Sequence, residues 1–155
     1  MSDGRERFLH GAFIRLFRLW AASRTLASDG LAAMDELAGR LGLPAHTPAA
    51  CETFFELIET RLGRALIAEC CCSQRLSADE QALFRLIALA PEAGPALTTD
   101  RLPHGLPSAI CWAAGAVRRA LGLPPASADT PAGGTYPHFC PFRPAPAAVE
   151  TSHGI

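Results

Sequence analysis

Apolar side chains recur along much of the chain at the spacing of one helix face. The first such segment covers about residues 5–26. Its apolar stripe follows the i, i+3, i+4, i+7 pattern and consists of Phe13, Leu16, Phe17 and Trp20. Arg15 and Arg18 interrupt the apolar run, and we expect both to face solvent. The pattern predicts an amphipathic helix with an aromatic buried face.

Four later segments repeat this periodicity, at about residues 29–41, 47–64, 78–90 and 109–121. Residues that favour the N-cap position stand at their starts: Ser28 or Asp29, Thr47, Ser77 and Ser108. The sharpest signal is the capping box of Ser77 and Glu80, in which each side chain binds the backbone amide of the other residue. No alternating strand pattern is present, although a brief extended stretch fits residues 64–71. We therefore expect an all-α fold, a small bundle of four to five helices.

The C-terminal part of the chain differs in composition. From Pro124 onward prolines recur and aliphatic residues are few, which is typical of a segment that builds no core. We expect residues 1–123 to form one helical domain, and residues 124–155 to be a Pro-rich, largely irregular tail that is disordered or draped over the domain. Residues 91–107 are rich in Pro and Gly and are expected to form a connecting loop.

Composition argues against several functional classes. The net charge is −1, whereas a dedicated nucleic-acid binder normally carries a strong basic excess, so nucleic acid is not an expected partner. No apolar run reaches the roughly 18 residues needed to span a bilayer. Arg15 and Arg18 also break the only stretch that resembles a secretory signal. We therefore expect a cytoplasmic protein whose cysteines stay reduced.

The charges are distributed unevenly along the first two segments. Arginines predominate in residues 1–27 and carboxylates in residues 28–60. We expect these segments to pack side by side with their charges facing each other at the rim; a basic arm for phosphate or anionic lipid is the alternative. All 14 basic residues are arginine, which suggests codons rich in G and C, as in some bacteria, more than selection for guanidinium chemistry.

The feature most relevant to chemistry is the triplet Cys70, Cys71 and Cys72. In an extended chain Cys70 and Cys72 would share one side, with Cβ atoms about 6.6 Å apart, and Cys71 would face the other side. Two thiolates on one tetrahedral zinc ion lie roughly 3.8 Å apart, so inward-leaning side chains could close that difference. A disulfide between direct neighbours is disfavoured, because their Cα atoms are only about 3.8 Å apart.

Three interpretations of the triplet remain open. In the first, it binds a soft metal, such as zinc, copper(I) or an iron–sulfur cluster, with His138 and Cys140 as further ligands. In the second, its thiols are reactive, because the start of the next helix and Arg75 favour thiolate. In the third, small buried thiols fill a tight bend between helices. Cys51 lies on the apolar stripe of its own segment and is expected to be a core thiol.

The order of these features resembles a known family. An apolar helix is followed by Asp29-Gly30-Leu31, by a helix of aromatic and acidic character, and then by the triplet and Leu76-Ser77-Ala78-Asp79-Glu80. This order is similar to a small alphaproteobacterial family of unknown function, in which three cysteines precede a capped helix. The similarity covers about residues 15–122, with Glu69 where that family has proline. It implies the helical fold and draws attention to the triplet, but it implies no activity.

Two functional hypotheses follow. The first is a non-enzymatic interaction or regulatory protein that acts through an unidentified protein partner and holds a soft metal, with zinc as the first choice, at Cys70, Cys71 and Cys72. The alternative is a thiol-dependent redox sensor or enzyme that uses the same triplet. Asp79 and Glu80 are better explained as helix-capping residues than as an acid–base pair.

Overall fold

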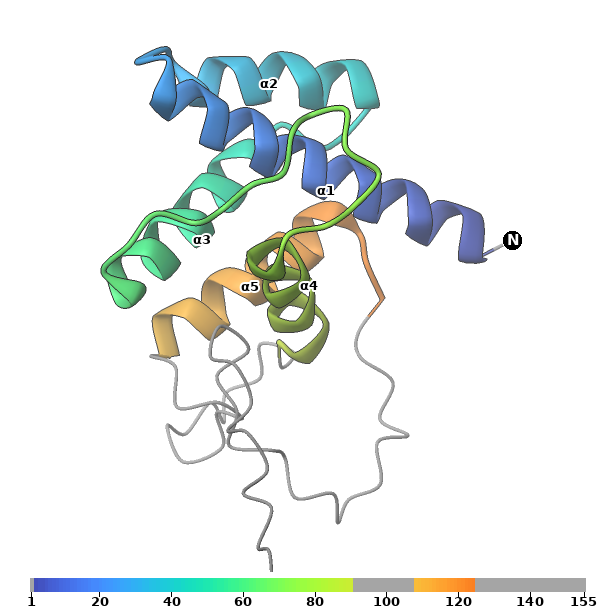
Figure 1. Cartoon of the computed structure of the whole chain (residues 1–155). Helices are drawn as coiled ribbons and strands as arrows, with labels where there is room; N and C mark the ends of the chain where they lie inside the picture. Colours follow the sequence, from blue (N-terminus) through green and yellow to red (C-terminus); the bar gives the residue numbers. More distant parts are fainter. Residues whose placement is uncertain (1, 91–107, 125–155) are drawn as a thin grey trace, which may run out of the picture.

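The computed structural model describes residues 2–90 and 108–124, which form a bundle of helices (Figure 1). These are α1 (Ser2–Thr25), α2 (Gly30–Leu41), α3 (Thr47–Leu62), α4 (Ala78–Leu89) and α5 (Ser108–Leu121). Helix α1 packs against α2 and α3, and α5 packs against α3 and α4. No strand occurs in these two ranges. The all-α prediction of four to five helices is confirmed.

Most helix ends follow the local signals. Asp29 caps α2 by accepting a hydrogen bond from the Ala32 amide at 3.0 Å, and the capping box of Ser77 and Glu80 is formed at the start of α4. The helices α2, α3 and α5 are followed by Gly42, Gly63 and Gly122, each with a positive φ that glycine adopts without steric cost.

Thr47 differs from its prediction as an N-cap. It is the first residue of α3, after His46, and its side chain is buried. Its hydroxyl donates to the carbonyl of Ala120 at 3.3 Å and so connects α3 to α5. A long-range partner for the hydroxyl replaces the local capping bond, because burial would otherwise leave that polar group unsatisfied.

Aromatic rings from α1 and α3 form the centre of the core. Phe55 lies in ring contact with Phe13, Phe17 and Trp20 of α1 and with Phe54 beside it, with centroids 5.1 to 6.0 Å apart. The first three belong to the stripe predicted from the helical periodicity, and all are buried. The stripe is confirmed as core.

Arg18 corrects the expectation that both arginines of α1 face solvent. Arg15 is exposed, but the side chain of Arg18 is only 7% exposed and forms an ion pair with Glu80 of α4, which is 0% exposed. A charged side chain tolerates such burial only when it is paired and fully hydrogen-bonded. The partners that satisfy Arg18 come from distant parts of the chain, so the local pattern did not predict them.

The unevenly charged segments lie side by side, as expected. Helix α1 packs on α2 and α3, and Arg24 near the end of α1 forms an ion pair with Glu59 of α3. The guanidinium carbon of Arg24 also lies 4.7 Å from the ring centroid of Trp20. The ion pair of Arg24 and Glu59 therefore lies beside Trp20, at the edge of the aromatic core.

Two predicted segments, the loop at 91–107 and nearly all of the tail at 124–155, lie outside the described residues, so the division into helical domain and tail remains a prediction. Within the described ranges, no helix is long and apolar enough to cross a membrane.

Candidate functional site

The cysteine triplet lies on the segment of residues 63–77 that connects α3 to α4, here called the cysteine loop. Figure 1 shows this loop, in green, crossing α1 before it enters α4. It contains neither helix nor strand, so the extended stretch proposed for residues 64–71 pairs with no other strand in the described chain. Cys70, Cys71 and Cys72 are all exposed.

The base of the cysteine loop is fixed to the start of α4. Arg64 forms a bidentate ion pair with Asp79, with nitrogen to oxygen distances of 2.7 and 2.8 Å. Asp79 also accepts from the Ile67 amide at 2.8 Å, and the Ser77 hydroxyl donates to the Ile67 carbonyl at 2.6 Å. Asp79 therefore does more than assist the helix start, because it ties the incoming chain to α4.

The far part of the loop is held by Arg18, which reaches across from α1. Its Nη1 donates to the carbonyls of Cys70 at 2.9 Å and Ser73 at 2.8 Å, and its Nη2 donates to the carbonyl of Arg75 at 2.7 Å. The same guanidinium donates to both carboxylate oxygens of Glu80, from Nε at 2.7 Å and from Nη2 at 3.1 Å. These five interactions equal the number of N–H donors in a guanidinium.

The chain turns at the triplet and is not extended there. The Ser73 amide donates to the Cys70 carbonyl at 2.8 Å, which closes a turn with Cys71 and Cys72 at its centre. The turn brings Cys70 Sγ and Cys72 Sγ to 3.0 Å from each other. The expected grouping of these two thiols is therefore present, but on a turn and not on an extended stretch.

The exposure of the triplet contradicts the interpretation that its thiols fill a tight, buried bend. All three lie at the surface. The side chains buried beneath them are those of Arg18 and Glu80, which fill the space between α1, α4 and the loop. The loop is thus stabilised by polar interactions, and its cysteines are exposed to solvent.

The paired thiols differ in acidity. Hydrogen bonds from the Cys72 amide and thiol, then from the Cys71 thiol, lower the pKa of Cys70 below the ordinary thiol value, with a smaller contribution from the charge of Arg18. The pKa of Cys72 is raised, first by its hydrogen bond to Cys70 and then by the charge of that neighbour. Cys70 is therefore the member of the pair that ionises first.

Helix α4 and Arg75 were expected to favour thiolate, but the pKa of Cys70 is lowered first by hydrogen bonds from its neighbouring cysteines and then by the charge of Arg18. Arg75 contributes its carbonyl, as a hydrogen-bond acceptor for Arg18. Sequence reasoning missed Arg18 and assigned Glu80 only a capping role. One local signal was available: the residue one turn before Arg18 is the apolar Ile14, which the structure buries, so the apolar face of α1 extends to the position of Arg18.

Two other cysteines are structural. Cys51 is 0% exposed, and burial raises its pKa to about 12. Cys111 is also buried, and desolvation raises its pKa. The prediction that Cys51 is a core thiol is confirmed. Neither residue is accessible for chemistry in the folded protein.

The remaining proposed metal ligands, His138 and Cys140, lie outside the described residues. Among the residues that the structure does describe, no group of three or more His, Cys, Asp or Glu side chains is arranged to hold a metal ion. From this part of the chain, a soft metal would receive the sulfurs of Cys70 and Cys72.

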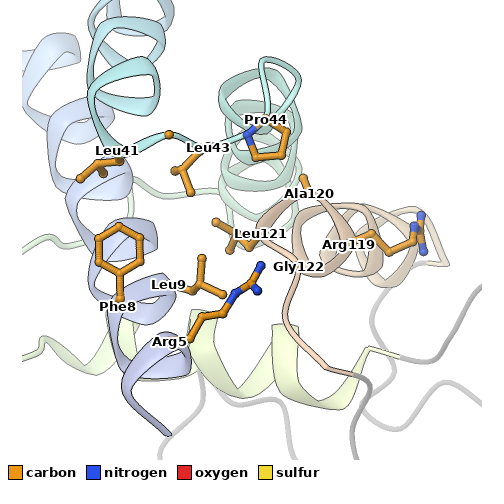
Figure 2. A pocket seen from close by; sticks show the side chains of 11 residues that line it. Arg5, Phe8, Leu9, Leu41, Leu43, Pro44, Arg119, Ala120, Leu121 and Gly122 are labelled. Carbon is orange, nitrogen blue, oxygen red and sulfur yellow. The ribbon is translucent and has the colours of Figure 1, made fainter. Parts of the chain in front are cut away.

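A cleft of about 390 Å³ lies elsewhere, where the first turns of α1 meet the ends of α2 and α5. Figure 2 shows the guanidinium of Arg5 turned into it beside Leu9 and below Leu121, while Arg119 points away. The carbonyl ends of two helices, marked by Gly42 and Gly122, meet there and carry partial negative charge.

Comparison with known proteins identifies no relative: no family model, no curated protein and no solved structure matches the chain. The resemblance to the alphaproteobacterial family stays a prediction.

Proposed function

We propose that the protein is a thiol-based redox switch in which Cys70 and Cys72 interconvert between a dithiol and an intramolecular disulfide. The observation that carries this proposal is the separation of 3.0 Å between the two sulfurs on an exposed turn. A disulfide bond measures about 2.0 Å, so closure requires a movement of about 1 Å. The switch would act as a regulatory device toward a protein partner.

The unequal acidity of the two thiols assigns their roles. Cys70, whose pKa is lowered, is the nucleophile, and Cys72 is the resolving thiol. With a hydroperoxide as oxidant, the Cys70 thiolate attacks the outer oxygen, the O–O bond breaks, and Cys70 becomes a sulfenic acid as an alcohol leaves. The Cys72 sulfur then attacks the Cys70 sulfur and the hydroxyl departs as water. Two thiols and one hydroperoxide yield one disulfide, one alcohol and one water.

Mass spectrometry of the triplet peptide tests the proposal. Trypsin cuts after Arg64 and Arg75, so one peptide carries the whole triplet. Treating the reduced, folded protein with one equivalent of hydroperoxide should remove two hydrogen atoms from this peptide, and dithiothreitol should restore them. Cys71→Ser should preserve the reaction, whereas Cys70→Ser and Cys72→Ser should each abolish it.

Buried Cys51 serves as the internal control, because it should resist alkylation until the protein unfolds. Retention of the disulfide in Cys72→Ser, or its loss in Cys71→Ser, would show that another pair forms it. Absence of any disulfide in the triplet peptide of the wild-type protein would overturn the proposal.

A second candidate function is a soft-metal site that also uses Cys70 and Cys72. The observation in its favour is the same pairing of sulfurs, which lies within about 1 Å of the separation on a tetrahedral zinc ion. Protein purified without a tag should then contain stoichiometric zinc, copper or iron. Cys140→Ser should release this metal and destabilise the fold together, because metal-binding energy in such sites is partly folding energy. Metal-free wild-type protein would exclude this candidate.

A further inference from the structure

We infer that Arg18 is a positioning residue for the Cys70 and Cys72 dithiol: its guanidinium holds the turn in the shape that brings the two sulfurs together. This inference rests on the proposed redox function and names the residue that controls it. The hydrogen bonds from Arg18 to the cysteine loop all go to backbone carbonyls, so Arg18 sets the separation of the sulfurs through the backbone.

The contacts of Arg18 bracket the turn. The Cys70 carbonyl, at the first residue of the turn, and the Ser73 carbonyl, at the last, both accept from the same Nη1. The Cys70 carbonyl also accepts from the Ser73 amide within the turn. Because one nitrogen fixes both ends of the turn, the sulfur of Cys72 between them is kept close to the sulfur of Cys70.

Arg18 can hold the turn because its own position is fixed. Glu80, which is 0% exposed, accepts from Arg18 and from the amides of Ser77 and Glu69. Two backbone amides, one at the start of α4 and one in the loop, therefore hold the carboxylate independently of the guanidinium. A planar fork with five donors satisfies all these acceptors in one arrangement, which a lysine ammonium does not reproduce.

Without these bonds, the exposed turn would sample extended shapes. In an extended chain the Cβ atoms of residues two apart lie about 6.6 Å from each other, too far for their sulfurs to react without reorganisation. The effective concentration of one thiol at the other would fall, and with it the equilibrium constant for ring closure.

Arg64 provides a matched control on the same loop. It is an arginine with a bidentate carboxylate partner, Asp79, and it holds the base of the loop. Its other hydrogen bond goes to the carbonyl of Ala65 and not to the triplet. Replacing Arg64 should therefore destabilise the loop base and leave the separation of the sulfurs unchanged.

The experiment measures the thiol–disulfide equilibrium against dithiothreitol for wild type, Arg18→Met, Arg18→Lys and Arg64→Met in the full chain. We expect Arg18→Met to lower the equilibrium constant for disulfide formation at least about five-fold, or about 20 mV on the two-electron scale. Arg18→Lys should fall between wild type and Arg18→Met, and Arg64→Met should match wild type. Equal losses in Arg18→Met and Arg64→Met would overturn the inference, because they would show only general weakening of the loop.

A second measurement examines the reduced protein. Phenylarsine oxide bridges two neighbouring thiols: two As–S bonds form, and the oxygen leaves as water with the two thiol protons. Bridging of Cys70 to Cys72 should be tight in wild type and Arg64→Met and several-fold weaker in Arg18→Met. If Arg18→Met does not fold, as judged by circular dichroism, Arg18→Lys and Arg64→Lys replace the methionine variants in both measurements.

The two measurements separate the inference from the proposed function. A wild-type protein that binds the arsenical in an Arg18-dependent way but forms no disulfide would refute the redox function and retain the positioning role. Bridging and disulfide formation that are both independent of Arg18 would refute the positioning role and retain the function.

Discussion

The ion pair between Arg18 and Glu80 concentrates the polar interactions of the loop in two buried side chains. Burying either charge alone is costly, and attraction between the charges offsets that cost only when the other hydrogen-bonding positions are also filled. Here the guanidinium has five interactions, and the carboxylate receives two backbone amides besides Arg18. The pair therefore specifies one loop conformation, and loss of one partner leaves the other charge uncompensated.

Glu80→Gln tests whether buried Arg18 needs the negative charge of Glu80. The amide keeps the size of the side chain but removes the charge, so Arg18 remains buried without its counterion. We expect a loss of about 3 kcal/mol in the free energy of unfolding, measured by urea denaturation. Glu36→Gln, which disrupts an exposed pair with Arg40, should cost less than about 1 kcal/mol. Equal effects of the two substitutions would contradict the argument.

The carboxylate of Asp79 predicts a dependence of stability on pH. Burial raises its pKa, but the hydrogen bonds from Arg64 and from the Ile67 amide outweigh burial, so the pKa lies below its ordinary value. A depressed folded pKa means that the stabilisation is complete above the unfolded value and is lost as pH falls through the folded value. The free energy of unfolding should therefore fall below about pH 5.

Asp79→Asn should reduce this slope in urea titrations at a series of acidic pH values, and it should lower stability at neutral pH. The slope will not vanish in this variant, because the pKa of Glu80 is also lowered, by Arg18 and two backbone amides, against the effect of its burial. An unchanged slope in Asp79→Asn would show that Asp79 does not contribute to the loss of stability at acidic pH.

At the scale of the elements, α2 and α4 begin with different kinds of cap. Asp29 is exposed and accepts one amide at the start of α2. Ser77 is buried, accepts the Glu80 amide at 3.0 Å, and donates to the Ile67 carbonyl at 2.6 Å. The start of α4 is thus part of the loop that carries the cysteines, whereas the start of α2 is a local helix end.

Ser77→Ala should consequently cost more than Asp29→Ala. Loss of a single cap typically costs about 1 kcal/mol, which we expect for Asp29→Ala. Ser77→Ala also leaves the Ile67 carbonyl without its donor, and we expect a loss of about 2–3 kcal/mol. The two losses in unfolding free energy are measured from the shifts of the urea midpoint, provided that the dependence on urea concentration is unchanged. Similar losses would show that the bond to Ile67 contributes little.

At the scale of the whole molecule, α1 connects the core to the cysteine loop. One of its faces places Phe13, Phe17 and Trp20 against Phe55 of α3, and Arg18 on the same helix binds the loop and α4. The dithiol therefore rests on the helix that also carries the central aromatic contacts. A change in the packing of α1 should reach the thiols through Arg18.

Phe55→Ala tests how much the aromatic contact between α3 and α1 contributes to stability. The substitution removes the ring that contacts Phe13, Phe17 and Trp20 of α1 and should cost about 3–5 kcal/mol in unfolding free energy. Because it loosens α1, it should also speed alkylation of Cys51, which is buried on the same helix as Phe55. Phe84→Ala, a partly buried ring on α4, should cost less. A loss below about 1 kcal/mol for Phe55→Ala would show that the core repacks around the missing ring.

The sequence by itself determined the elements and much of the core. Helical periodicity and capping preferences are local, so they predicted four to five helices, the aromatic stripe of α1, the core position of Cys51 and the capping box of Ser77. The residue type alone singled out the triplet, and the alternation of side chains in an extended chain placed Cys70 and Cys72 on one side.

Only the tertiary structure decided the conformation of the triplet and the surroundings of Arg18. The acceptors of Arg18 lie 52 to 62 residues away along the chain, so no periodic pattern marks them. Those same distant bonds hold the triplet as a turn, so neither an extended stretch nor a buried bend described its conformation and exposure. Whether an arginine on a helix faces water or the interior depends on a carboxylate and carbonyls that folding alone brings near it.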